Sequence, residues 1–397
     1  MNQQITPPRS TLKFSQSDDS VECHQREIRE IILFCYGDSR LASTWSNVPY
    51  LMSCEFERRG IKVCRVDLSS KNNIFTKLAN RLYKAVYGPY YTYIRSDIFR
   101  FLTNRKIKRA LKQYPDADFA VFLMFDFIPP KGAIPTLIFS DWTYKMLVKE
   151  RNYRELTGGD RKFVRQQNEA IDGADIVLPL FAESYNTMIR ENPNANIRFI
   201  DTNVVNNLYS GNIEDLSSIV QKKCKSDYIL FIGKKAYAHG LRLLVDAIKA
   251  SGTDIRLEVI GMTSDDVGEV PEFCRFHGFL HKDIKQENEK YYDLLMGAKA
   301  ICNPTPVWAG YSSLIEAMYF YTPVITSPFK QFEQEFGKQP DFGFYTDGDD
   351  LKDVLGRLFS LSSEEYCKMA FLAHEKVKDY TWDNYVGQML EMMKEKL

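Results

Sequence analysis

The stretch from Asn303 to Ser327 reads NPTPVWAGYSSLIEAMYFYTPVITS and contains a loop, a helix and a strand in immediate succession. Leu314, Met318 and Tyr321 recur at helical spacing, which predicts a helix with one buried face. Pro323 ends this helix, and the apolar residues that follow predict a short buried strand. A helix that leads directly into a buried strand is typical of an α/β unit in a parallel sheet.

The start of this helix has the features of a phosphate site. Ser312 and Ser313 lie in the first turn, where free backbone N–H groups and the positive end of the helix dipole favour an anion. Glu316 lies one turn further on, and its side chain can reach back toward that turn and accept from a ribose diol. A structural role fits these residues equally well, since either serine can cap the helix while Glu316 complements the dipole.

Length and composition predict a globular chain of about two domains. The 397 residues are 44% apolar and 26% charged, and 52 basic residues balance 52 acidic ones. A net charge of zero gives no global attraction to nucleic acid, so an electrostatic partner must meet a local patch. The eight cysteines include no CxxC pair and the five histidines are scattered, so we expect neither a disulfide framework nor a metal site.

The sequence has no apolar run of about 18 residues, so no transmembrane segment is expected. The stretch 1–26 is polar and lacks the apolar core of a signal peptide, and we expect it to be a disordered tail. These features predict a cytoplasmic protein.

Strands and helices alternate along both halves of the chain. Continuous apolar runs, which are typical of buried parallel strands, occupy 31–37, 61–67, 117–127, 134–139, 174–179 and 197–200 in the first half. The pattern restarts at 228–233, 256–261, 276–280 and 299–304, after a polar stretch at 202–227.

The fold class expected from this alternation is α/β, with two Rossmann-like doubly wound domains that face each other across a cleft. We predict a first domain over 27–205, a second domain over 206–380, and a C-terminal helix over 381–397 that packs back on the first domain. Asp141 follows the strand at 134–139, so it is expected at the carboxyl edge of the first sheet, where open α/β folds bind ligands. It can equally cap a helix that starts at Thr143.

The segment 71–112 differs from the rest of the chain because it holds eleven Lys or Arg residues against a single acid, Asp97. Seven Tyr or Phe residues, from Tyr83 to Phe101, are interleaved with these cations. Cations mixed with aromatics suit an anionic membrane surface, and they also suit single-stranded nucleic acid. The third interpretation is a solvated helical face whose aromatic side chains turn toward the core.

Three segments of the second half resemble, in order, the nucleotide-sugar domain of glycosyltransferase family 4, a family of retaining enzymes with the GT-B fold. FIGKKAYAHG at 231–240 resembles the family's strand, its Gly-Arg/Lys turn and its Lys-Gly helix start. FHGFL at 276–280 resembles the short strand beside the base. LIEAM at 314–318 with TPVI at 322–325 resembles the Leu-Glu-Ala-Met and Pro-Val-Ile signature. In the first half, ADIVLP at 174–179 resembles the family's Ala-Asp-x-Val segment.

The resemblance assigns donor-binding roles to residues of the second half. Lys234 stands after Gly233 where a family Arg or Lys contacts the donor diphosphate, and Glu316 stands where a family Glu binds the ribose. The backbone N–H groups of Ser312, Ser313 and Leu314 would bind the phosphates, and Phe279 would lie beside the base. The donor-binding set is therefore Gly233, Lys234, Phe279, Ser312, Ser313, Leu314 and Glu316.

The chain departs from the family pattern at three positions. Trp308 occupies the place of the first Glu of the family's E-x7-E pair, a residue that contacts the donor sugar. His239 replaces the usual Lys, although a histidine can still donate to phosphate. Ser140-Asp141 lies where many members carry a His near the sugar. Lys234, His239 and Asp141 are therefore the predicted catalytic residues.

The resemblance implies a retaining glycosyltransferase of the hexosyltransferase type, with a nucleotide-diphosphate sugar as donor and no metal or other cofactor. The acceptor would be a saccharide or a lipid-linked molecule near the 37–45 loop, as in assembly of a bacterial surface polysaccharide or glycolipid. With the patch at 71–112 against an anionic membrane, the inner face of the cell membrane becomes the expected location, and no nucleic-acid partner is expected. The alternative is a catalytically silent GT-B-like scaffold that binds nucleotide sugar without transfer.

Overall fold

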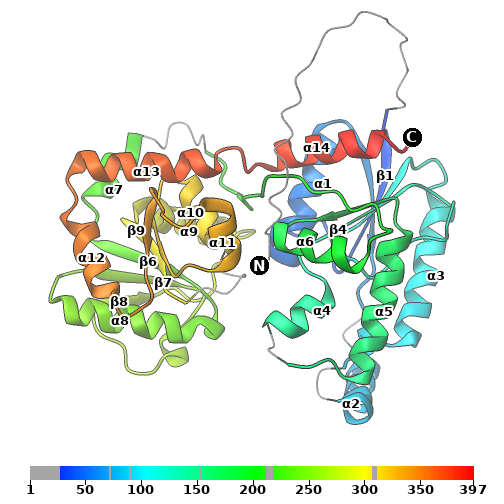
Figure 1. The fold of residues 1–397 in the computed structure, drawn as a ribbon, viewed down its shortest axis with the longest axis horizontal. Helices are drawn as coiled ribbons and strands as arrows, with labels where there is room; N and C mark the ends of the chain where they lie inside the picture. The colour runs from blue at the N-terminus through cyan, green and yellow to red at the C-terminus, as the bar shows by residue number, and fades with distance from the viewer. Residues whose placement is uncertain (1–26, 71–72, 89–90, 152–153, 212–217, 306–310) are drawn as a thin grey trace, which may run out of the picture.

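The computed structural model describes residues 27–70, 73–88, 91–151, 154–211, 218–305 and 311–397. The tail predicted at 1–26 lies outside this description, as do Trp308 and Gly310. The described residues form two α/β domains that lie next to each other (Figure 1). Within these ranges no helix is long and apolar enough to cross a bilayer.

The first domain is built on a parallel sheet with the strand order β2-β1-β3-β4-β5. Its strands are β1 (Glu30–Cys35), β2 (Lys62–Asp67), β3 (Phe119–Phe122), β4 (Thr136–Ser140) and β5 (Ile176–Pro179). Its helices are α1 (Val48–Arg58), α2 (Ile74–Tyr87), α3 (Asp97–Gln113), the short α4 (Tyr144–Met146), α5 (Gly158–Gly173) and α6 (Ala182–Glu191). In Figure 1 most of these helices lie against the sheet, whereas α2 lies at the lower edge of the domain.

The central strands of this sheet are buried on both faces, which explains their continuous apolar sequence. Residues 31–34 of β1 are fully buried, and the ring of Phe34 stacks on that of Phe122 in β3 at 4.3 Å. Helix α1 is followed by Arg59 and then Gly60, whose φ of +80° lies in the left-handed region that ends many helices. The chain can therefore turn directly from α1 into β2.

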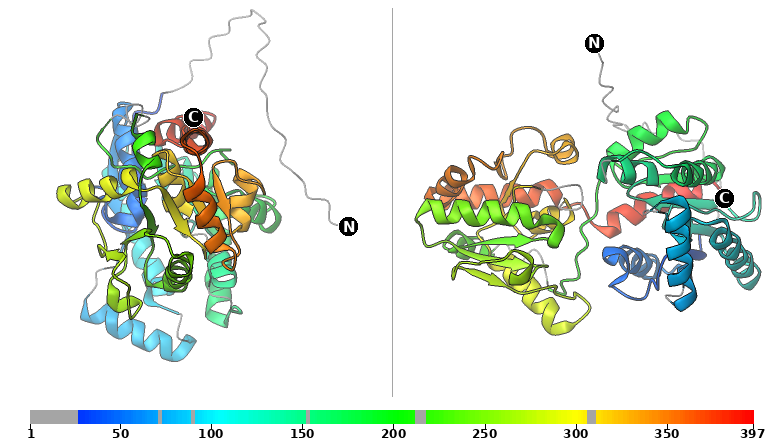
Figure 2. Two further views of the ribbon diagram at one scale, coloured as in Figure 1. Left: turned by 90° about the vertical axis from the view of Figure 1, so that its left-hand side faces the viewer. Right: turned by 90° about the horizontal axis from the view of Figure 1, so that it is seen from below.

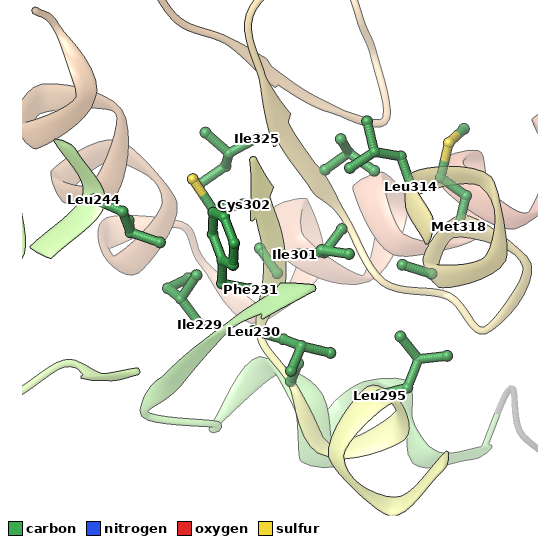
Figure 3. Packing of buried hydrophobic residues seen from close by; sticks show 14 of the residues in the cluster. Ile229, Leu230, Phe231, Leu244, Leu295, Ile301, Cys302, Leu314, Met318 and Ile325 are labelled. Atoms are coloured by element: carbon green, nitrogen blue, oxygen red, sulfur yellow. The ribbon is translucent and has the colours of Figure 1, made fainter. Parts of the chain in front are cut away.

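The second domain has a parallel sheet with the order β11-β10-β9-β6-β7-β8. Its strands are β6 (Tyr228–Ile232), β7 (Arg256–Ile260), β8 (Cys274–Phe276), β9 (Ala300–Asn303), β10 (Val324–Thr326) and β11 (Gly343–Tyr345). Its helices are α7 (Val220–Cys224), α8 (Ala238–Ser251), α9 (Lys285–Gly297), α10 (Tyr311–Tyr319), α11 (Lys330–Phe336), α12 (Leu351–Ser360) and α13 (Ser363–Val377). Figure 3 shows the core, where Phe231 and Ile301 of neighbouring strands lie between Leu244 of α8 and Leu314 of α10.

The chain passes between the domains twice, near residue 205 and near residue 380 (Figure 2). The second passage leads into α14 (Trp382–Lys394), which packs against α1 of the first domain. Six α14 side chains are buried in the hydrophobic cluster of that domain: Trp382, Tyr385, Val386, Met389, Leu390 and Met393. Arg59, directly after α1, also donates to the Asp383 side chain at 2.5 Å. The first domain therefore takes part of its core from the far end of the sequence.

Two of the expected strands differ in the structure. The run at 197–200 makes only an isolated parallel bridge, between Ile197 and Val177 of β5. After one pair of backbone hydrogen bonds with Val177, the chain leaves the sheet toward the second domain, so no strand forms. The strand expected at 276–280 lies earlier in the chain, as β8 at Cys274–Phe276. The residues from His277 to Leu280 form a loop instead, which turns at Gly278 with a φ of +65°.

Candidate functional site

The two domains meet at segments that follow the carboxyl ends of their strands. Phe181 lies two residues after the end of β5, and its ring lies 5.7 Å from that of Tyr311, the first residue of α10. Glu183, at the start of α6, is 4% exposed and accepts from the side chains of Lys330 and Gln331 at the start of α11. Since ligands of open α/β sheets bind at carboxyl edges, this junction borders the candidate site.

The turn after β6 positions Lys234 at this edge. The amide of Gly233 donates to the carbonyl of Ile260 at 3.0 Å, and a Cβ on Gly261 would stand 2.6 Å from the carbonyl oxygen of Gly233. Only glycine, which also tolerates the φ of +95° at position 261, allows this backbone contact. The side chain of Lys234 is exposed, and its ammonium nitrogen lies 5.8 Å from the centre of the Phe279 ring.

Phe279 lies in the loop after β8, and its ring is 57% exposed. The carbonyl of Gly278 accepts from the amide of Gly261 at 2.6 Å, so this loop is fastened to the turn that carries Lys234. His277 is fixed on the buried side, where its Nε2 lies 2.6 Å from Oε2 of the buried Glu258. The structure thus brings the predicted residues Gly233, Lys234 and Phe279 together as an exposed cation beside an exposed aromatic face.

The predicted phosphate-binding residues of α8 and α10 start at the same edge. His239 is exposed in the first turn of α8, and a Cβ on the neighbouring Gly240 would stand 2.2 Å from Oγ1 of Thr305, so the loop after β9 runs close to that turn. In the first turn of α10, Ser312 is exposed, Ser313 is half-buried and Leu314 is fully buried.

Glu316 occupies a different environment from the open one expected of a ribose ligand. It is 4% exposed and pairs with the ammonium of Lys282. Its two carboxylate oxygens also accept from the hydroxyls of Tyr291 at 2.8 Å and Tyr292 at 3.2 Å, both on α9. Burial, together with the charge of Glu316, raises the pKa of Tyr291 well above its ordinary value, so this hydroxyl stays a donor. The ribose role of Glu316 remains a prediction, and in the structure the carboxylate is already hydrogen-bonded.

Four residues at this edge are not among those predicted from the sequence: Lys282, Tyr291, Tyr292 and Asn303. The first three carry no local signal, because only the fold brings them to Glu316. Asn303 ends β9 and is 1% exposed, and within the described part of the chain its amide has no hydrogen-bond partner. The rule that selected Asp141, a polar residue at the end of a buried strand, would also have selected Asn303.

Asp141 lies in the first domain, across the junction from Lys234. Its Oδ1 accepts from the amide of Trp142 at 2.8 Å and from the hydroxyl of Ser140 at 3.3 Å. The cap of α4 is Thr143, whose hydroxyl accepts from the amide of Met146, so Asp141 does not have the capping role considered above. Its role near the donor sugar remains a prediction.

The expected acceptor loop follows β1 at the same edge of the first sheet. The amide of Gly37, which has a φ of +103°, donates to Oδ1 of Asp67 at the end of β2 at 2.9 Å. Trp45, Ser46 and Asn47 have positive φ values of 37°, 53° and 74°, which non-glycine residues rarely adopt in succession. The loop therefore has a specific, tightly turned shape.

Comparison with solved structures identifies the arrangement of the two domains. The structure matches WaaG, a glycosyltransferase involved in lipopolysaccharide biosynthesis, with a TM-score of 0.61 at 14% identity over 92% of this chain and 99% of that one. It matches HepE of Anabaena, in complex with UDP and glucose, with a TM-score of 0.55 at 13% identity over 92% of this chain and 100% of that one. The chain has the GT-B fold. This confirms the fold class expected from the sequence.

The same fold also occurs in a protein that is described as a phosphatase rather than as a glycosyltransferase. The N-terminal domain of trehalose-6-phosphate phosphatase from Candida albicans matches with a TM-score of 0.62 at 11% identity, over 96% of this chain and 99% of that one. No protein-family model matches the sequence, and no curated protein matches it either. At these identities the likeness describes the fold, and the activity has to be argued from the site.

Proposed function

We propose that the protein is a retaining glycosyltransferase that moves a sugar from a nucleotide-diphosphate sugar to an acceptor hydroxyl. The observation that carries this proposal is the pairing of the exposed Lys234 ammonium with the exposed Phe279 ring at the carboxyl edge of the second sheet. A nucleotide diphosphate needs both features, because its base can stack on an aromatic face while its phosphates need a cation. HepE, which has this fold, is described as a complex with UDP and glucose.

In the proposed reaction the bond between the anomeric carbon and the diphosphate oxygen breaks, and the departing diphosphate gains negative charge. Lys234, His239 and the backbone N–H groups at the start of α10 would stabilise that charge. The acceptor oxygen forms its bond on the face that the diphosphate leaves, which retains the configuration, and the acceptor proton passes to the leaving group. Asp141, across the junction, would orient the donor sugar or the acceptor.

The experiment that tests the site compares two adjacent lysines. Lys234→Ala should abolish donor turnover and weaken UDP binding by roughly ten- to a hundred-and-fifty-fold, since a charged hydrogen bond to phosphate is worth about 1.5–3 kcal/mol. Lys235→Ala is the matched control, because Lys235 is also exposed but pairs with Asp266 at 3.3 Å. Both variants should keep the melting temperature of the unmodified protein. Unimpaired turnover by the Lys234 variant would overturn the site assignment.

The donor and the acceptor belong to the same proposal. We expect a saccharide or lipid-linked acceptor near the 37–45 loop, and an anionic membrane surface as partner of residues 71–112. A panel of nucleotide sugars can be ranked by the rise in melting temperature that each produces, because ligand bound to the native state raises stability. The base and sugar that give the largest rise identify the donor.

A second candidate function is that of a catalytically silent GT-B protein that binds nucleotide sugar as a scaffold. It is favoured by Trp308, which stands where the resembling family keeps its sugar-contacting Glu, and by the occurrence of this fold in the N-terminal domain of a phosphatase. Calorimetry with nucleotide sugars, followed by an assay for donor hydrolysis, separates the two functions. Binding without turnover across the donor panel would favour the scaffold.

A further inference from the structure

Helix α2 presents an apolar face to solvent along its whole length. Five of its side chains are more than three-fifths exposed, and they recur on one side of the helix: Ile74 (76%), Phe75 (76%), Leu78 (64%), Leu82 (63%) and Val86 (65%). None of the 14 residues of α2 is buried. A contiguous exposed apolar surface of this kind marks an interaction site rather than ordinary surface variation.

The opposite face of α2 holds the helix on the domain. The side-chain oxygen of Asn80 accepts from the amide of Tyr93 at 2.7 Å, and the ring of Tyr83 lies 6.0 Å from that of Tyr87 and 5.9 Å from that of Tyr91. Asn73 and Thr76 form a capping box at the start of the helix. Tyr83 thus packs inward on Tyr91, whereas the aliphatic side chains and Phe75 turn outward, and the capping box holds the helix without a partner.

A row of cations runs along one edge of the apolar face. Lys77, Arg81 and Lys84 are exposed at helical spacing, and no acidic residue occurs between Asn73 and Ser96. The next helix continues the pattern, since Ile98 and Phe101 of α3 are 57% and 61% exposed. Beyond them α3 presents the exposed cations Arg105, Lys108, Arg109 and Lys112. An apolar face with a cationic edge complements anionic lipid, in which acyl chains lie beneath phosphate headgroups.

We propose that α2 inserts its apolar face into the boundary between headgroups and acyl chains of an anionic bilayer, with Lys77, Arg81 and Lys84 on the lipid phosphates. This narrows the membrane surface expected for residues 71–112 to one inserting helix, and it makes apolar burial as necessary as charge. A second copy of this face fits less well, because the stretch from Asn73 to Ser96 contains no acidic residue that could pair with Lys77, Arg81 and Lys84.

The position of α2 connects this surface to the acceptor side of the molecule. The helix follows β2, and Asp67 at the end of β2 accepts from the amide of Gly37, which opens the 37–45 loop. A bilayer that holds α2 therefore lies at the side of the domain where the proposed function expects the acceptor. Only this consequence, a lipid-linked acceptor, rests on the proposed function, whereas insertion of α2 does not.

The test uses the full chain and vesicles of phosphatidylglycerol or of phosphatidylcholine. The unmodified protein should float with the anionic vesicles and much less with the neutral ones. Leu78→Gln with Leu82→Gln should weaken binding to the anionic vesicles by about tenfold or more, because the apolar area buried in lipid is lost. Ile189→Gln is the matched control, since Ile189 is an exposed apolar residue (39%) on α6 of the same domain, and it should bind normally.

A fluorescent residue distinguishes insertion from surface adsorption. Trp fluorescence of a Leu82→Trp variant should gain a component, absent from the unmodified protein, that shifts to shorter wavelength on anionic vesicles and is quenched by brominated acyl chains. An unchanged signal at position 82, or full binding by the Leu78/Leu82 variant, would overturn the proposal. So would a dimer that the same substitutions dissociate without any vesicle binding.

These results are independent of the donor site. UDP binding and donor hydrolysis in the absence of vesicles should be the same in the α2 variants and in the unmodified protein. If Lys234→Ala has no effect while the α2 variants lose vesicle binding, the proposed function fails and the membrane surface stands. If Lys234→Ala abolishes turnover while the α2 variants still bind vesicles, the donor site stands and the membrane proposal fails.

Discussion

Lys282 and Glu316 form an ion pair within the second domain, with side-chain exposures of 14% and 5%. Glu316 belongs to α10, which the proposed function places on the donor side, and Lys282 lies between β8 and α9. The same carboxylate accepts from Tyr292, whose hydroxyl in turn accepts from the amide of Leu208 at 2.7 Å. Because Leu208 lies on the segment that joins the two domains, Glu316 links the candidate donor helix to the interdomain connection.

Removing the cation of this pair should be strongly destabilising. Lys282→Met leaves the carboxylate of Glu316 buried with only neutral donors, and we expect a loss of about 3–5 kcal/mol in the free energy of unfolding, measured by urea denaturation. Lys285→Met is the control, because the Lys285 side chain is 88% exposed and pairs only at the surface, 3.9 Å from Glu289. It should change the stability by less than about 0.5 kcal/mol.

The double variant Lys282→Met with Glu316→Gln tests whether charge is the cause. A neutral amide keeps the shape of Glu316 without an uncompensated charge, so the double variant should be more stable than Lys282→Met alone. Equal destabilisation in both would mean that Lys282 acts through its packing on Tyr291, whose ring centre lies 4.2 Å from the ammonium.

Phe279→Ala should weaken nucleotide binding without loss of stability. The ring is 57% exposed, so its removal costs little folding energy, whereas stacking on a base is worth about 1–3 kcal/mol, or roughly five- to a hundredfold in affinity. Calorimetry with UDP and GDP measures the effect. Phe371→Ala, which removes a 43% exposed ring on α13, is the control and should bind nucleotide normally. Equal affinity in the two variants would exclude Phe279 from the donor site.

Lys223 should make stability depend on pH near neutrality. It is 1% exposed and donates to the carbonyl of Leu295 at 3.0 Å and to the hydroxyl of Thr322 at 2.6 Å, and burial lowers its pKa to about 7. Its pKa in the unfolded chain is about 10.4, so between these values the unfolded chain binds more protons than the folded one. Stability contributed by this group therefore rises with pH from about 7, by up to about 1.4 kcal/mol per pH unit.

Lys223→Met should flatten this rise between pH 7 and pH 9. The Leu295 carbonyl keeps a donor in the variant, because the Thr322 hydroxyl lies 3.3 Å from it. The neighbouring Lys222 is exposed, and Lys222→Met should leave the pH dependence unchanged. The prediction fails if urea denaturation gives the same slope for the unmodified protein and for Lys223→Met.

Glu183 should contribute to the arrangement of the domains rather than to the folding of either one. Glu183→Gln removes the charge that pairs with Lys330 across the junction, so we expect a wider distribution of domain positions and a larger radius of gyration in X-ray scattering. Glu191→Gln, which removes a pair with Lys145 inside the first domain, should leave the scattering unchanged. Identical scattering for both variants would show that the apolar contact of Phe181 with Tyr311 is sufficient.

The sequence predicts the fold well where burial alone determines structure. β1 and β6 are continuous apolar runs because helices cover both faces of a parallel strand, and these runs locate both sheets. The run at 197–200 is equally apolar, yet it forms no strand, because it meets β5 at the single pair Ile197 and Val177 before leaving for the other domain. This outcome depends on the path that the chain takes after residue 200, and the local sequence pattern carries no information about that path.

In the candidate site, too, some residues can be predicted from local sequence and others depend on the complete fold. Gly233, Lys234 and Phe279 are identifiable because glycine turns and strand ends are local features. Lys282 could not be assigned to Glu316, because the two residues are 34 positions apart with a helix and a strand between them, and only the finished sheet brings them together. For α2, composition indicates a cationic and aromatic segment, but only the structure shows that Tyr83 packs inward on Tyr91 while Leu78 and Leu82 face solvent.

The packing of α14 on the first domain has a consequence for synthesis on the ribosome. The cluster around β1 and β3 is complete only when residues 382–394 have been made, after the whole of the second domain. The second domain can therefore fold first. Until α14 is made, the first-domain segment keeps part of its apolar surface exposed to solvent. A chain that ends at residue 380 and has been released from the ribosome should resist protease across 228–377 and remain sensitive near α1.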